Sequence, residues 1–180
     1  MSANVRDRRH PEQPFAFEQG ARRFVIEDVA GVRVGITGLL SPRFTTEASP
    51  PLPAGVQEHL RVIDPARAMR EAVRELRASG ADVVVVLSHM IHDDMLRVAR
   101  DVDGIDVVLG THLGPPTERP QVVNGTIVAV AGPDELQALG QLDLVVRSGR
   151  VARVAFRRHI PSGSVPVDRE VEAVIAEFRR

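Results

Sequence analysis

Two short apolar runs, each followed within a few residues by a histidine, constrain the fold of this chain most strongly. Residues 83–87 (VVVVL) precede His89, residues 105–109 (IDVVL) precede His112, and an amphipathic segment separates the two runs. Four consecutive valines are typical of a parallel strand that is buried on both faces of a sheet. We therefore expect a strand, a helix and a second strand, joined by a right-handed crossover.

His89 and His112 fall at the carboxyl ends of these two strands, where open α/β sheets bind their ligands. Two imidazoles at one sheet edge can form half of a metal site. On spacing alone, His89 is equally explained as a core or edge histidine, and His112 as a loop residue. The other polar residues near the strands have structural explanations: helix capping for His92, Asp93 and Asp94, turn or strand-edge positions for Asp82 and Asp106, and surface positions for His10, His59 and His159.

The first half of the chain contains clear signals for turns, a loop and the two ends of a helix. Residues 22–29 and 32–38 predict a β-hairpin across Ala30-Gly31, and the four prolines of residues 42–55 predict a loop. Asp64 followed by Pro65 predicts the start of a helix that Gly80 ends. Residues 1–21 are polar and contain little that would form regular structure alone.

The second half predicts two more hairpins and a helix. Asn124-Gly125 is a strong type I′ turn signal, and Ser148-Gly149 separates two longer strands. An apolar stripe after a linker at residues 161–166 predicts a C-terminal helix. We expect the apolar stripes of all helices to lie in the core.

Composition excludes several classes of function. The net charge is −1 and the chain has no cysteine, tyrosine or tryptophan, which argues against nucleic-acid binding, disulfides and thiol chemistry. No apolar run approaches the roughly 20 residues of a membrane span, and the first residues contain no signal-peptide core. We expect partners to include neither nucleic acid nor membrane.

Several stretches together resemble the calcineurin-like metallophosphoesterases, in their 5′-nucleotidase and UDP-sugar hydrolase branch. They are similar to that family in order and spacing: Ser2-Ala3-Asn4-Val5, residues 32–39, the helix of residues 64–80, Leu87-Ser88-His89, residues 104–110, residues 123–126 and residues 165–168. The resemblance implies an αββα sandwich, of which this chain forms part: an α/β fold with a mixed sheet, a βαβ unit and antiparallel hairpins in the second half.

The resemblance also implies a centre of two divalent metals, such as Mn²⁺ or Zn²⁺, bridged by an aspartate and a water that the metals activate. His89 corresponds to the histidine of the L-S-H motif, and His112 to the first histidine of G-H-x-H. Gly114 stands where the second histidine would be, and nothing corresponds to the D-x-H, G-D and G-N-H motifs. The implied ligands, His89 and His112, serve one metal, which two imidazoles would hold weakly; no catalytic residue is assigned.

We expect one partial domain over residues 1–180, with an extended segment at 1–21 and a linker and helix at 161–180. On this interpretation the chain carries the C-terminal half of a hydrolase domain acting on small, nucleotide-type phosphate esters. An N-terminal half or a partner chain would supply the other ligands. Two alternatives stay open: an inactive scaffold without metal, and an interaction module whose exposed strand edges favour association. The family suggests a periplasmic or secreted protein, but no location is assigned.

Overall fold

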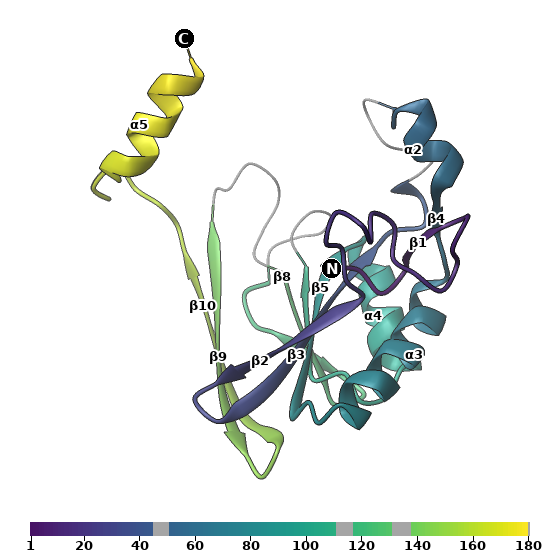
Figure 1. Ribbon diagram of the computed structural model, residues 1–180. Helices are drawn as coiled ribbons and strands as arrows, with labels where there is room; N and C mark the ends of the chain where they lie inside the picture. Colours follow the sequence, from purple (N-terminus) through teal and green to yellow (C-terminus); the bar gives the residue numbers. More distant parts are fainter. Residues whose placement is uncertain (45–50, 111–116, 131–137, 180) are drawn as a thin grey trace.

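A six-stranded mixed sheet forms the centre of the protein, with the strand order β2-β3-β5-β6-β8-β7 (Figure 1). The computed structural model describes residues 1–44, 51–110, 117–130 and 138–179. Four inner strands run parallel: β3 (Val32–Leu40), β5 (Val83–His89), β6 (Val107–Gly110) and β8 (Thr126–Val130). Two edge strands are antiparallel to their neighbours: β2 (Phe24–Val29) and β7 (Gln121–Val123). The expected mixed sheet and its flanking hairpins are confirmed.

The expected βαβ unit consists of β5, α4 (His92–Asp101) and β6. One detail of its prediction is wrong, because neither Asp93 nor Asp94 is the N-cap of α4. Ile91 holds that position without a side-chain hydrogen bond, and both aspartates lie in the first helical turn. The carboxylates there still oppose the positive end of the helix dipole, and Asp94 pairs with Arg97 at 2.7 Å.

Helix α3 (Pro65–Ala78) begins and ends as the sequence predicts. The Asp64 carboxylate accepts a hydrogen bond from the Arg67 amide at 2.8 Å. Gly80 follows the C-cap with a φ of +84°, a conformation that favours glycine. The apolar stripe of α3 is fully buried, and α3 and α4 together cover one face of the sheet (Figure 1).

A small two-stranded sheet lies beside the N-terminal half of α3. Its strands are β1 (Val5–Asp7) and β4 (Leu60–Val62), and the short helix α2 (Ala54–His59) leads into β4. The sequence of residues 1–21 contains little that would form regular structure alone, and β1 forms there by pairing with β4, a distant segment. One expectation is corrected at its end, because α2 begins at Ala54, inside the loop predicted over residues 42–55. Asn4 reinforces that arrangement by exchanging hydrogen bonds with the Leu40 backbone at 2.8 and 3.0 Å.

The other face of the main sheet carries a separate hairpin of β9 (Leu139–Arg147) and β10 (Arg150–His159) (Figure 1). Both expected turns are confirmed by their backbone. Asn124 and Gly125 have φ values of 48° and 80°, and Ser148 and Gly149 have values of 50° and 68°. Positive φ at both central residues is the geometry of a type I′ turn.

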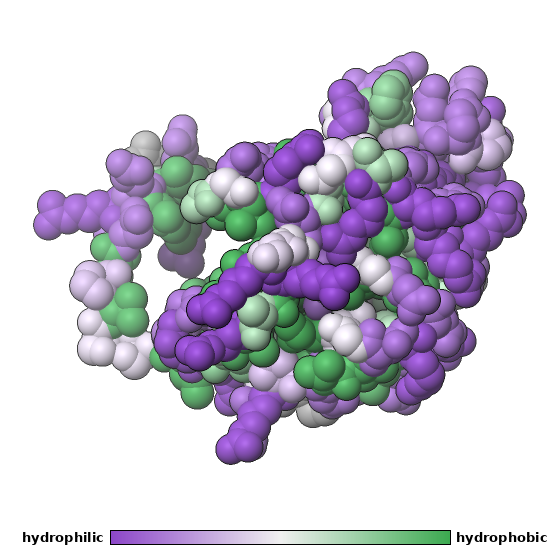
Figure 2. Space-filling model, turned by 90° about the horizontal axis from the view of Figure 1, so that it is seen from below, coloured by the Kyte–Doolittle hydropathy of each residue, from purple (hydrophilic) through white to green (hydrophobic). Residues whose placement is uncertain are grey.

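Helix α5 (Arg169–Phe178) follows the linker, as the sequence pattern predicts, and the structure shows that Asp168 is its N-cap. Its apolar stripe is not core, however, which corrects the expectation for this helix. Val174 is 65% exposed and Phe178 is 93% exposed, because no described element packs against the stripe. In Figure 1 the C-terminal arm stands clear of the body, and Figure 2 shows apolar side chains at the surface on that side. Among the described helices, none has the length and apolar character needed to cross a membrane.

Candidate functional site

His89 is the last residue of β5, at the carboxyl end of a central parallel strand. Its carbonyl oxygen accepts a hydrogen bond from the Ser41 amide at 3.0 Å, which ties the ends of β5 and β3 together. The edge of the Phe44 ring meets the imidazole with 6.1 Å between ring centres. Since strand side chains alternate between faces, His89 shares the face of Leu87, and Ser88 lies on the helix-covered face. The structure thus places a partly buried imidazole at the predicted sheet edge.

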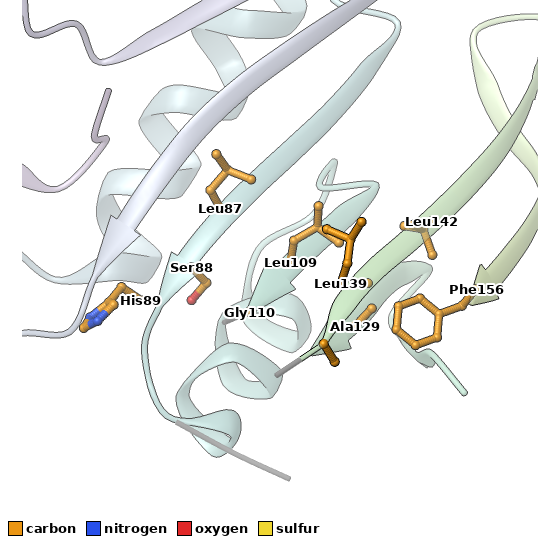
Figure 3. Close-up of a pocket in the computed structure, with 11 residues that line it drawn as sticks. Leu87, Ser88, His89, Leu109, Gly110, Ala129, Leu139, Leu142 and Phe156 are labelled. Atoms are coloured by element: carbon orange, nitrogen blue, oxygen red, sulfur yellow. The ribbon is translucent and has the colours of Figure 1, made fainter. Parts of the chain in front are cut away.

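A cavity of about 520 Å³ opens on this face of the sheet, at the end where β5 and β6 terminate. Its apolar wall comes from Leu109 of β6 and from Leu142 and Phe156 of the β9–β10 hairpin. Figure 3 shows these side chains gathered between the two β-layers, with His89 at the margin. Of the two polar residues that line it, His89 lies on the cavity face, and the Ser88 side chain points to the helix-covered face. A mostly apolar cavity with a few polar groups at one edge is typical of a small-molecule site.

Ser88 and Gly110 lie side by side at the base of the cavity, as register partners on β5 and β6. The Ser88 Oγ is buried and has no hydrogen-bond partner among the described residues. A Cβ at Gly110 would lie 2.5 Å from the Met95 sulfur, so a larger residue there would require the Met95 side chain to move. The sequence signalled Ser88 only through the L-S-H resemblance, and it gave no sign that Phe156 would face the cavity.

A metal centre is not complete within the described residues. No group of three or more His, Cys, Asp or Glu side chains in the described ranges could hold an ion. His112 follows Gly110 by two positions, but both His112 and Gly114 lie outside the described residues. The assignment of His89 and His112 as ligands therefore stays a prediction. His89 alone does not fit a metal ion, which needs about four ligands when it is zinc.

The aspartates near the strand starts have structural roles, as their sequence positions predict. Asp106 Oδ2 accepts hydrogen bonds from the Val84 amide at 2.7 Å and from Arg77 Nη2 at 2.6 Å. Asp82 Oδ2 accepts from the Arg33 amide at 2.9 Å. These contacts join the start of β5 to its neighbours, at the opposite end of the strand from His89.

Among the residues that the structure describes, no other histidine forms a metal-binding group with His89. His92 lies in the first turn of α4, with its Nε2 3.2 Å from the Gln121 side-chain nitrogen. His159 on β10 is exposed and its Nε2 lies 2.9 Å from the Gln141 side-chain oxygen. His10 is also exposed, and its Nδ1 lies 3.9 Å from Glu12.

Two 5′-nucleotidases are among the known proteins that are similar to this chain. No family model matches the chain. A probable 5′-nucleotidase of Treponema pallidum (strain Nichols) is 31% identical over 84 residues, 47% of this chain and 13% of that protein. The structure of a 5′-nucleotidase precursor from Thermus thermophilus has a TM-score of 0.76 and 27% identity, covering 99% of this chain and 37% of the other.

A second solved structure, the sulfate thiohydrolase SoxB of Thermus thermophilus in complex with glycerol, has a TM-score of 0.77 at 25% identity. It covers 98% of this chain and 31% of its own. The chain therefore spans well under half the length of each of these three proteins. The fold expected from the sequence resemblance is confirmed by these likenesses.

Proposed function

We propose that this chain, a relative of the calcineurin-like metallophosphoesterases of the 5′-nucleotidase type, contributes the His89 edge of a metal-dependent phosphate-ester hydrolase. The observation that carries the proposal is the position of His89. It stands at the carboxyl end of a parallel strand, on the face where a cavity of about 520 Å³ opens. The neighbouring strand ends in register at Gly110, two residues before His112.

The proposed metal requires ligands besides His89, because the described residues hold no complete set. We assign the second imidazole to His112, which follows β6 directly. The remaining ligands would come from an N-terminal half of the domain or from a partner chain. Because the ligands are divided between this chain and another part, we predict that the chain by itself binds a divalent ion weakly. Hydrolysis would need the complementary part.

The proposed substrate class is a small phosphate ester of the nucleotide type. This substrate class is supported by the sequence identity of the chain to a probable 5′-nucleotidase and to a 5′-nucleotidase precursor. The similarity to a sulfate thiohydrolase means that the fold alone does not select phosphate. Substrate choice is therefore tested directly, by comparing a nucleoside monophosphate with p-nitrophenyl phosphate and with a thiosulfate-type ester in the same assay.

The test is metal stoichiometry after dialysis against Mn²⁺ or Zn²⁺. We expect about one ion per wild-type chain, and loss of that ion in both His89→Ala and His112→Ala, since two imidazoles form half of a site. His10→Ala is the matched control, because it removes an exposed imidazole that does not line the cavity beside His89. Equal metal content in wild type and in the double variant would contradict the proposal and would favour the inactive scaffold.

A second candidate function, the interaction module, is supported by apolar surface around the same cavity. Leu87 on the sheet is 44% exposed and Leu139 on the hairpin is 65% exposed. Exposed apolar groups that lie together often mark a surface for another protein segment. Light scattering over a range of concentrations tests this function: a growing dimer fraction supports it, and a monomer throughout the range contradicts it.

A further inference from the structure

A second pocket lies away from His89, between the small β1–β4 sheet and the N-terminal half of α3. It has a volume of about 350 Å³ and shares no lining residue with the cavity beside His89. Arginines from four segments converge on it, and we call it the arginine pocket. Its lining residues are Arg6, Arg23, Arg61, Arg67, Pro11, Glu12, Ile63 and Glu71.

Positive charge is in excess among these residues. Four guanidinium groups face two carboxylates, those of Glu12 and Glu71. A third carboxylate nearby, that of Glu75, is already paired, because Arg23 Nη1 donates hydrogen bonds to its two oxygens at 2.6 and 2.8 Å. Glu71 is divided between two arginines, with Arg67 Nε at 3.4 Å and Arg23 Nη2 at 3.9 Å. Glu71 is therefore shared between Arg67 and Arg23, while the other pocket carboxylate, Glu12, lies 3.9 Å from His10.

Arg6 makes no direct ion pair among the described residues, and the charges of Glu71 and Glu75 only partly offset the effects that lower its pKa. It is 4% exposed, and its Nη1 is buried without a hydrogen-bond partner among the described residues. Its direct partner across the β1–β4 ladder is Arg61, and like charges placed opposite each other destabilise a strand pair. Burial, and then the nearby charge of Arg23, lower the pKa of Arg6. A buried cation without a direct ion pair is costly, because carboxylates that do not contact it replace only part of its lost hydration.

A second guanidinium beside Arg6 also has unused donors. The Nε and Nη2 atoms of Arg23 are buried and have no hydrogen-bond partner in the described ranges. Planar guanidinium groups with free N–H donors match the oxygens of phosphate, which accept several charge-assisted hydrogen bonds at once. The pocket therefore offers what one small, multiply charged oxyanion needs.

We propose that the arginine pocket binds a phosphate-like oxyanion, with Arg6 and Arg23 as buried donors and Arg61 and Arg67 at the rim. The ligand neutralises the excess charge and joins β1, β4 and α3 to Arg23, the residue before β2. Free inorganic phosphate and the phosphoryl group of a small ester present the same oxygens. The site is separate from the proposed hydrolytic site, so its existence does not depend on the role of His89.

The experiment measures thermal unfolding of the full chain in increasing inorganic phosphate, with sodium chloride added to hold ionic strength constant. A ligand that binds the folded state raises the melting temperature in a concentration-dependent way. We expect this rise in wild type, in His89→Ala and in Arg153→Met, a control for an exposed arginine on β10. We expect Arg6→Met to weaken the apparent affinity by about tenfold or more, the effect of losing a charged hydrogen-bond donor.

A second readout separates binding from folding. In chloride alone, Arg6→Met should melt at or above the wild-type temperature, because methionine fills similar space without a buried charge. Should Arg6→Met fail to fold, Arg61→Gln at the exposed rim should weaken phosphate binding by about twofold to fivefold. Repeating the titration with glycerol phosphate distinguishes the two sources, and saturation by either supports the site. No stabilisation by either anion beyond that of chloride, or equal stabilisation of wild type and the arginine variants, would overturn the proposal.

Discussion

Asp106 offers the sharpest test of how the sheet is held together, because one carboxylate oxygen serves two donors from different elements. Asp106→Ala removes the acceptor for the Val84 amide at 2.7 Å and for Arg77 Nη2 at 2.6 Å. The backbone bond from the Asp106 amide to the Val84 carbonyl, at 3.0 Å, is unaffected. The substitution therefore tests the side chain alone.

The expected magnitude follows from the exposure of the two donors. Val84 is 0% exposed, and leaving its amide without an acceptor costs about 1–3 kcal/mol. The Arg77 side chain is 33% exposed, stays hydrated after losing its partner, and adds about 0.2–1 kcal/mol. We therefore expect Asp106→Ala to lower the free energy of unfolding by about 2–3 kcal/mol, which corresponds to about 5–10 °C in melting temperature for a chain of this size.

Urea denaturation followed by circular dichroism measures this effect. Asp106→Asn should cost less, about 1 kcal/mol, because its amide oxygen still accepts the Val84 N–H. Asp101→Ala, at an exposed position at the end of α4, should stay within about 0.5 kcal/mol of wild type. The structural reasoning is refuted if Asp106→Ala is as stable as Asp101→Ala, or if it loses bound metal while remaining fully stable.

Three further outcomes follow from the structure. Hydrogen bonds from Arg9 hold the pKa of Asp7 well below its usual value of about 3.9, so the stabilisation from this pair is present in full above pH 4 and declines as the pH falls further. The difference in stability between wild type and Asp7→Asn, measured by urea denaturation, should therefore shrink from pH 7 to pH 2. A difference that stays constant over this range would contradict the role of Arg9. Gly125→Ala should cost about 1 kcal/mol, because φ is +80° there, whereas Gly163→Ala, with no atom within 4 Å of the added Cβ, should be neutral in the same assay. Removing residues 161–180 should leave the urea midpoint unchanged, since α5 buries no residue, and a large loss would show that the arm packs on the body.

Local signals explain which elements could be predicted from the sequence. The Asp64 cap, the glycine after α3 and the Asn124-Gly125 turn each act within a few residues, and all three are present in the structure. The valine run of β5 was identified as an interior parallel strand because burial on both faces imposes its composition. The position of His89 at the sheet edge follows directly from the end of that strand.

Features that need distant segments could not be predicted in the same way. β1 and β4 are three residues each and pair across more than fifty positions, so neither has a local pattern. The arginine pocket combines Arg6, Arg23 and the N-terminal half of α3, and no periodicity links those positions. The stripe of α5 has the same spacing as the stripe of α3, and only the absence of a packing partner among the described elements distinguishes them.

The exposed stripe of α5 has a thermodynamic consequence for anything the C-terminal arm touches. An isolated helix of ten residues is shorter than the roughly 12–15 residues at which helices become marginally stable in water. Its Asp168 cap lowers the cost of the first turn but does not supply the missing length. Covering the stripe must therefore also fix the backbone of the arm. The resulting loss of conformational entropy offsets part of the free energy gained by burying apolar surface. Contacts made through α5 are consequently expected to be weaker, and to dissociate faster, than their apolar area would suggest.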